Sequence, residues 1–292
     1  MKNLNCLFSG GTTPVTFQEL KALTLSELRN FKAWYGTDEL QGEEPVFPKV
    51  EELEIRNCGS LPALPKAASV IVKLPGGLDF KCRSAFPELR KMSLSHSGTF
   101  DRWEVVEGTL GEEVTFPRLE ELSIIWCKSL RALPKGKLIT QPLPKGSLAE
   151  ESFGGAETMC RRSAFPALRK LRLSVLGTLE GTPGDEVIFP LLEDLSIDGC
   201  PKFTDLPEAP KLSKLAIEGS IFIEGNNQKI SLQAASRYFP SLSSLSLAVS
   251  PADTETTLQH VKQEWNHKVL PLVAMMLTRC DVLFSSHSSS VN

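Results

Sequence analysis

The sequence predicts an α/β solenoid, with short parallel strands on one face and irregular loops on the other. Two observations lead to this fold class: eight segments of the 292 residues share one spacing of apolar side chains, and three of them continue into the same second motif. Repeats with a period of about 20 to 50 residues are typical of solenoids. The eight copies begin at Phe17, Phe47, Phe86, Phe116, Phe165, Phe189, Ala209 and Phe239.

Each copy predicts one short strand. Counting its first residue as offset 0, apolar residues recur at offsets 3, 6 and 8, and proline usually occupies offset 1. Because successive side chains of a strand point to opposite faces, the residues at offsets 6 and 8 enter the core together. We therefore expect the offset-6 residues Leu53, Met92, Leu122 and Leu171 to lie in one row of a parallel sheet.

Three copies extend through Cys58, Cys127 and Cys200 into the pattern L-x-x-L-x-I-x-x-C-x-x-L-x-x-L-P. This pattern resembles the leucine-rich repeat, in its intracellular plant form with cysteine in place of asparagine. The resemblance implies a right-handed superhelix with its strands on the concave face and irregular loops on the convex side. Buried in the turn, each cysteine should act as a small apolar residue with a weak S–H donor. Successive cysteines would lie about 9–10 Å apart, beyond the reach of a disulfide.

A longer period pairs copies that have this extension with copies that lack it. Trp34 and Trp103 both fall 17 positions after the opening phenylalanine of their pair, which favours a role as loop anchors. The stretches Lys66–Ala85 and Lys135–Ala164 are rich in proline, glycine, serine and lysine. We expect them to form long convex or edge loops.

The chain divides into an array at 1–250 and a C-terminal cap with a tail at 251–292. A helix is predicted after Ser250, because Pro251 and Asp253 suit a helical first turn. The nearly continuous apolar segment Val269–Phe284 should then close the end of the array, and the serine-rich tail should be disordered. No matching cap precedes the first copy, so the array is expected to be incomplete at its N-terminal end.

Over roughly residues 15–250, the alternating units resemble the C-terminal repeat region of plant nucleotide-binding leucine-rich-repeat immune receptors. LEELSIIWCKSLRALP from Leu119 and LEDLSIDGCPKFTDLP from Leu192 carry the resemblance. It implies a protein-recognition module of intracellular plant innate immunity, which senses a pathogen effector or a guarded host protein through the concave face. The phosphate-binding motif G-x-x-x-x-G-K-[ST] is absent from the sequence. We therefore expect no nucleotide switch in this chain, and a full-length receptor is a further candidate partner.

Composition argues against other classes. The formal net charge of −3 gives no basic field for nucleic acid or an anionic membrane, and no apolar run reaches the length of a membrane span. Neither H-E-x-x-H nor G-x-S-x-G occurs, so we expect no enzyme, no metal, no cofactor and no small-molecule substrate. Seven widely spaced cysteines indicate a reducing compartment, the cytoplasm or the nucleus. The alternative function is a non-signalling repeat scaffold or a protein inhibitor of an enzyme.

Charges alternate in sign from copy to copy at offsets 4 and 5. Two interpretations stay open: a self-neutralising ladder, with about 0.2–1 kcal/mol for each lateral pair, or an ordered polar floor for a protein partner. Ile125 and Trp126 form an apolar pair that either contacts a partner or packs locally. The candidate protein-binding residues are Glu52, Glu54, Arg56, Lys91, Ser93, Glu121, Ser123, Ile125, Trp126, Lys170, Arg172, Asp194, Asp198 and Lys214.

Overall fold

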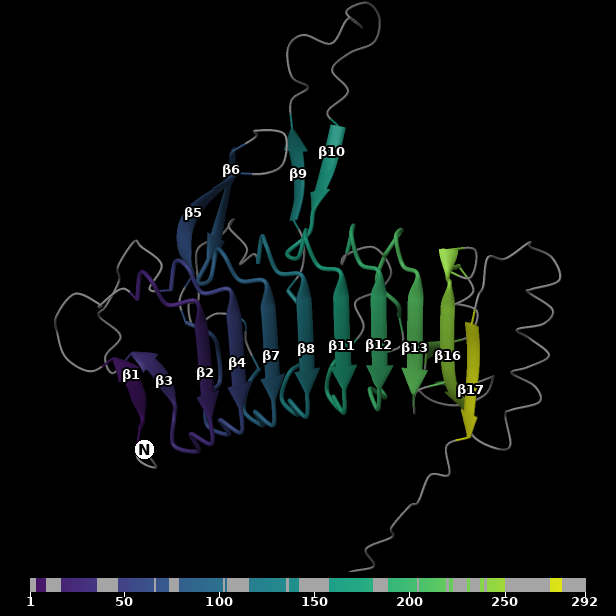
Figure 1. Cartoon of the computed structure of the whole chain (residues 1–292), viewed down its shortest axis with the longest axis horizontal. Coiled ribbons are helices and arrows are strands. Elements are labelled where there is room, and N and C mark those ends of the chain that lie inside the picture. The colour runs from purple at the N-terminus through teal and green to yellow at the C-terminus, as the bar shows by residue number, and fades with distance from the viewer. Residues whose placement is uncertain are drawn as a thin grey trace, which may run out of the picture.

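The fold is that of a computed structural model of the chain. It describes residues 4–8, 17–35, 47–65, 67–73, 79–101, 103, 116–134, 137–141, 158–180, 189–203, 205–218, 221–222, 230–231, 237–238, 241–249 and 274–279. Its main feature is one nine-stranded sheet in which every neighbouring pair is parallel (Figure 1). The strands, from one edge to the other, are β2 (Ala22–Ser26), β4 (Glu52–Arg56), β7 (Lys91–Ser95), β8 (Glu121–Ile125), β11 (Lys170–Ser174), β12 (Asp194–Asp198), β13 (Lys214–Glu218), β16 (Ser244–Val249) and β17 (Ala274–Arg279).

Each of the eight copies contributes one strand, and the strands pair in the register that the repeat predicts. Leu53 lies beside Met92, Met92 beside Leu122, and Leu122 beside Leu171. All four side chains are at most 2% exposed. The residues at offset 8 form a second buried row, which confirms the predicted alternation.

The opening phenylalanines stack beneath the sheet. The rings of Phe47 and Phe86 have centroids 5.3 Å apart, and those of Phe116 and Phe165 lie 5.5 Å apart. Trp34 contacts the first pair edge-on. Such aromatic pairs each add about 0.5–1.5 kcal/mol beyond the burial of their surface.

Trp34 and Trp103 occupy the same place one block apart. The indole of Trp34 donates a 2.9 Å hydrogen bond to the carbonyl of Ala63, and that of Trp103 donates one of the same length to Ala132. Both acceptors lie 29 residues further along the chain. Each indole therefore holds a loop of the following copy in place. This confirms the role as loop anchors that the equal spacing from the opening phenylalanines predicted.

A residue with left-handed backbone conformation directly follows six of the strands. Offset 10 has φ between 54° and 58° at Glu27, Asn57, His96, Trp126, Val175 and Gly199. The next residue turns inward. It is fully buried in five of the six copies and partly buried at Leu28, and in three copies it is cysteine. The thiols of Cys58, Cys127 and Cys200 approach backbone carbonyl oxygens at 3.4–3.7 Å, so these cysteines serve the turn as predicted.

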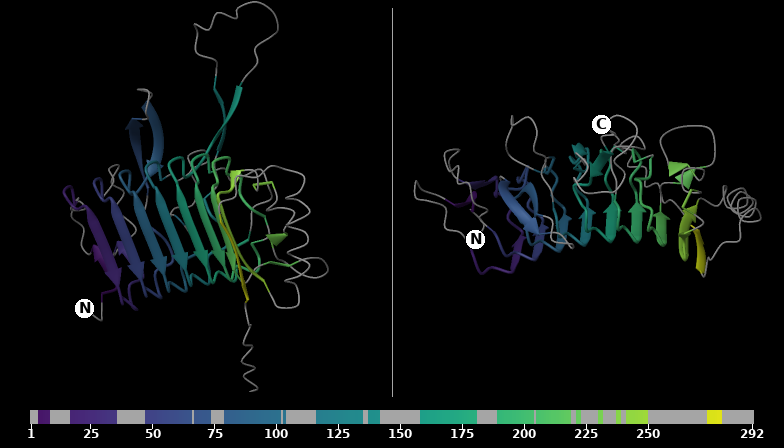
Figure 2. Two further views of the ribbon diagram at one scale, coloured as in Figure 1. Left: turned by 45° about the vertical axis from the view of Figure 1, so that its right-hand side comes forward. Right: turned by 90° about the horizontal axis from the view of Figure 1, so that it is seen from above.

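The two stretches expected as irregular loops contain antiparallel hairpins instead. β5 (Ala68–Lys73) pairs with β6 (Asp79–Ser84), and β9 (Lys137–Gln141) pairs with β10 (Thr158–Arg162). Three consecutive β-branched residues, Val70, Ile71 and Val72, favour a strand over a loop. Both hairpins project from the edge of the large sheet at which its strands begin (Figures 1 and 2).

Smaller strand pairs complete the structure. β1 (Cys6–Phe8) pairs with β3 (Ala33–Tyr35), and β14 (Ile221–Phe222) pairs with β15 (Ile230–Ser231), both in parallel. The predicted C-terminal helical cap has no support: residues 250–273 and 280–292 lie outside the described part of the chain, and the segment between them is strand β17, which extends the sheet. Within the described residues no helix is long and apolar enough to cross a membrane.

Candidate functional site

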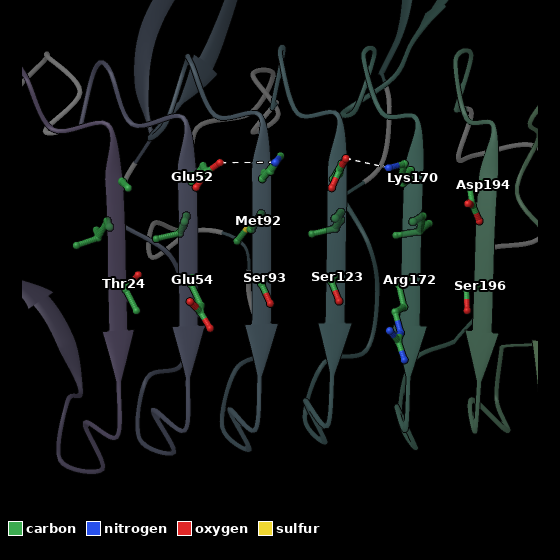
Figure 3. A pocket seen from close by; sticks show the side chains of 17 residues that line it. Thr24, Glu52, Glu54, Met92, Ser93, Ser123, Lys170, Arg172, Asp194 and Ser196 are labelled. Carbon is green, nitrogen blue, oxygen red and sulfur yellow. Dashed lines mark hydrogen bonds and ion pairs between the residues drawn. The ribbon is translucent and has the colours of Figure 1, made fainter.

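One face of the nine-stranded sheet carries polar side chains, and we call it the sheet face. It is formed by the residues at offsets 5, 7 and 9 of each copy, which alternate with the buried rows. A hollow of about 530 Å³ lies on it, open along strands β2 to β12 (Figure 3). Its polar lining consists of Thr24, Glu52, Glu54, Lys91, Ser93, Glu121, Ser123, Lys170, Arg172, Asp194 and Ser196.

Offset 4 forms a first charge column just before the strands. Its residues are Lys21, Glu51, Arg90, Glu120, Arg169 and Glu193. Arg90 lies between two carboxylates, 2.7 Å from Glu120 and 4.0 Å from Glu51, and Glu51 also lies 3.8 Å from Lys21. A further pair, Arg169 and Glu193, is 2.5 Å apart. The predicted lateral pairing is therefore present in this column.

Offset 5 forms a second charge column on the sheet face itself. Its residues are Glu52, Lys91, Glu121, Lys170, Asp194 and Lys214. Lys91 lies 3.6 Å from Glu52, and Lys170 donates a 3.1 Å hydrogen bond to Glu121. This hydrogen bond and the charge of Glu121 raise the pKa of Lys170. Four of the six charges are thus paired laterally, which leaves the column with little net field.

A third charge column, at offset 2, was not predicted from the sequence. Lys49 lies 2.6 Å from Glu19, and Arg118 lies 2.8 Å from Glu88. The signal was visible in the sequence, because the four residues alternate in sign and each is opposite in sign to the residue two positions later. The signs of the charges therefore alternate in two directions. They alternate from one copy to the next, and also between offsets 2 and 4 within each of these four copies.

The middle row of the sheet face, at offset 7, differs from the charge columns. It reads Thr24, Glu54, Ser93, Ser123, Arg172 and Ser196 across strands β2 to β12. Glu54 and Arg172 have opposite charges, yet within the described residues no hydrogen bond or ion pair joins either side chain to another group. The two serines lie between them (Figure 3).

The third row, at offset 9, lies toward the ends of the strands. Arg56 donates a 3.3 Å hydrogen bond to Ser26, and Ser174 donates a 3.0 Å hydrogen bond to Asp198. Ile125 lies between Ser95 and Ser174 in this row and is half-buried. The row is therefore mixed, with one apolar side chain at its centre.

Trp126 directly follows Ile125 and is 42% exposed. Its ring stacks on His96, the residue at the same offset of the preceding copy, with centroids 6.0 Å apart and planes within 6°. The ammonium group of Lys128 lies 5.5 Å from the centroid of the same ring. Trp126 thus packs locally and also leaves part of its surface exposed. His96 and Lys128 were not predicted as neighbours of Trp126, although a comparison of offset 10 between copies could have paired His96 with Trp126.

Comparison with known proteins gives a consistent family signal. The chain is 31% identical over 155 residues to the probable disease resistance protein RF9 of Arabidopsis thaliana, and 29% identical over 156 residues to the probable disease resistance protein RDL5 of the same plant. It is also 37% identical over 76 residues to the disease resistance RPP8-like protein 3 of A. thaliana. The chain is homologous to plant disease resistance proteins. No family model matches the chain, and no solved structure matches it significantly.

The similarity covers only part of this chain and part of each disease resistance protein. The first two matches span 45% of this chain and 14–15% of the relatives' length, and the third spans 25% of this chain and 8% of the relative. The matched segment therefore corresponds to a small portion of these proteins. This agrees with the resemblance to their repeat region that the sequence motifs carry.

The described residues offer little for metal or thiol chemistry. They contain no cluster of three or more His, Cys, Asp or Glu side chains that could hold a metal ion. Burial raises the pKa of Cys127 and of Cys200 to about 11, and it also raises the pKa of Cys58. Because the thiolate is the reactive form, these three cysteines are poor nucleophiles.

Proposed function

We propose that this chain is a right-handed leucine-rich-repeat solenoid that recognises a protein in intracellular plant innate immunity. The partner would be a pathogen effector, a guarded host protein or a full-length receptor. The chain would act by display, without catalysis and without a nucleotide switch of its own, in the cytoplasm or nucleus. The disease resistance proteins to which it is homologous support the immune role.

The observation that carries this proposal is the sheet face itself. Parallel strands about 4.8 Å apart hold its three rows at fixed spacing, so side chains from six copies reach one hollow. The rows are mostly polar and lie on a buried core. The core makes the face rigid, and the polar side chains keep it from exposing a large apolar surface. Rigid surfaces lose less conformational entropy on binding, so many modest contacts can add up to useful affinity.

A binding screen with a multiple variant tests the proposal. The chain and its variants would be assayed against candidate effectors and host proteins in a two-hybrid format, followed by biolayer interferometry. The sheet-face variant replaces five residues with alanine: Glu54, Ile125, Trp126, Arg172 and Asp198. The control variant replaces five exposed residues elsewhere with alanine: Ile71, Arg131, Glu180, Lys202 and Lys211.

We expect the sheet-face variant to lose binding and the control variant to keep it. Both variants should show the far-UV circular dichroism of the original chain, because the replaced side chains are not part of the buried rows. If the sheet-face variant keeps every interaction, the binding surface lies elsewhere, and the projecting hairpins β5–β6 and β9–β10 become the next candidates.

A further inference from the structure

The middle row of the sheet face has the layout of a receptor for a dipolar peptide. Glu54 on β4 and Arg172 on β11 are the charged residues of this row, and they are separated by the strands that carry Ser93 and Ser123. Three strand spacings place the two charged strands about 14 Å apart. We call the side chains of Glu54 and Arg172 the two poles of the row. Unlike the paired charges at offset 5, neither pole has a hydrogen-bond or ion-pair partner within the described residues.

The small floor between the poles leaves room for a bound chain. Serine side chains at Ser93 and Ser123 lie in the hollow of about 530 Å³, with the longer side chains of Lys91 and Glu121 at offset 5 on one side. The offset-9 row borders them on the other side, outside the lining of the hollow. The two bordering rows are four residues apart along each strand, or about 13 Å. A helix with its side chains is about 10–12 Å wide and would take up almost all of this distance before the side chains of the two rows are counted. An extended segment is narrower and can reach the serines between the rows.

The chemistry of the floor also suits an extended segment. Such a segment has unpaired backbone N–H and C=O groups that need partners. Hydroxyl groups both donate and accept hydrogen bonds, and Thr24, Ser93, Ser123 and Ser196 place them along the row.

The spacing of the poles sets the spacing of the complementary charges. An extended chain rises about 3.3–3.4 Å per residue, so about 14 Å corresponds to four residues. Residues i and i+4 of an extended chain also point to the same side, because side chains alternate with a period of two. A basic residue over Glu54 and an acidic residue over Arg172 can therefore come from one segment.

We propose that the middle row binds an extended segment of a partner protein that carries a basic and an acidic side chain four residues apart. The site rests on the proposed function, since it assigns a recognition chemistry to the sheet face. Charges next to the poles do not cancel this preference. Glu52 and Lys170, two residues before the poles, are paired with Lys91 and Glu121. Arg56 keeps its charge, but its side chain bonds to Ser26 on β2, on the side of β4 away from Ser93.

Three synthetic peptides and two charge reversals test this assignment. Each peptide has nine residues of serine and threonine, with charged residues at its third and seventh positions: arginine and glutamate, two glutamates, or two arginines. Binding is followed by NMR as shifts of the backbone amides of Ser93 and Ser123, in a buffer of low ionic strength so that exposed charges are weakly screened. The variants are Glu54→Lys, Arg172→Glu and the control Glu218→Lys, which changes an exposed carboxylate of the sheet face outside the hollow.

We expect the original chain and the control to prefer the mixed peptide by about tenfold at low salt. Glu54→Lys creates two positive poles and should shift the preference to the peptide with two glutamates. Arg172→Glu should shift it to the peptide with two arginines. If a reversal perturbs the fold, the neutral variants Glu54→Gln and Arg172→Gln should instead abolish the preference.

Equal affinity for all three peptides, or a preference that the reversals leave unchanged, would overturn the assignment. The two proposals fail in different ways. If the binding screen finds partners that need the sheet face while the peptides show no preference, the dipolar site is wrong and the proposed function stands. If the peptides are discriminated but no partner depends on the sheet face, the site exists and the proposed function is wrong.

Discussion

Replacing Arg90 with glutamate reverses one charge in the centre of the first charge column. Arg90 lies 2.7 Å from Glu120 and 4.0 Å from Glu51, and the three side chains are 41–48% exposed. Arg90→Glu therefore removes two ion pairs and places three carboxylates on adjacent copies. Arg131→Glu is the matched control, because Arg131 is exposed and its side chain lies outside the charge columns.

The size of the effect follows from the exposure of the pairs. An exposed ion pair contributes about 0.2–1 kcal/mol, and like charges at the same spacing are unfavourable by a similar amount. Two lost attractions and two new repulsions together should lower the free energy of unfolding by about 1–4 kcal/mol in dilute buffer. In 1 M salt the Debye length falls to about 3 Å, so less than half of this loss should remain.

Urea denaturation of both variants at low and high salt measures this difference. We expect a lower midpoint for Arg90→Glu at low salt, substantial recovery in 1 M NaCl, and almost no change for Arg131→Glu. A loss of the same size at both salt concentrations would show that Arg90 acts through packing. No loss at low salt would show that the charge column contributes nothing, and the reasoning would be refuted.

Three further changes have defined outcomes. Gly199 has φ 58° and room for a Cβ, with its nearest neighbour at 3.6 Å, so Gly199→Ala should cost about 1 kcal/mol of stability through backbone strain alone. Gly177→Ala, at a site with ordinary φ and open space, should be neutral or slightly stabilising in the same denaturation assay. Trp34→Phe leaves a buried carbonyl without its donor and should cost about 1–3 kcal/mol, whereas Trp103→Phe, whose acceptor is exposed, should cost less. The pKa of Cys127 is raised to about 11, so the folded state holds this proton more tightly than the unfolded state. Its contribution to stability is complete below pH about 9 and is lost as the pH rises toward 11, and Cys127→Ala should flatten that alkaline decline in denaturation midpoint.

The regular part of the fold was predictable because a parallel sheet needs the same residue class at the same offset of every copy. Leu53, Met92, Leu122 and Leu171 share one row for this reason, and the cysteines share one turn. The hairpins were not predicted. Their strands do not follow the apolar spacing of the eight copies, and glycine and proline around them favoured a loop interpretation.

The left-handed turn after six of the strands was also hidden. Glu27, His96, Trp126, Val175 and Gly199 share this conformation but no chemistry, because the stacked copies impose it. A sequence pattern can reveal only what residue types have in common. The structure was needed to show that His96 and Trp126 stack and that Glu54 and Arg172 have no partner within the described residues.

Site-specific photo-crosslinking tests the central claim, that the sheet face recognises a protein, most directly. Benzoylphenylalanine would replace Ser123 on the floor of the hollow, Ile71 on hairpin β5–β6, or Arg131 beyond the end of β8, and each variant would be irradiated with a partner from the binding screen. We predict a crosslink from Ser123 and none from Ile71 or Arg131. Crosslinks from Ile71 or Arg131 with none from Ser123 would contradict the account and move recognition away from the sheet face.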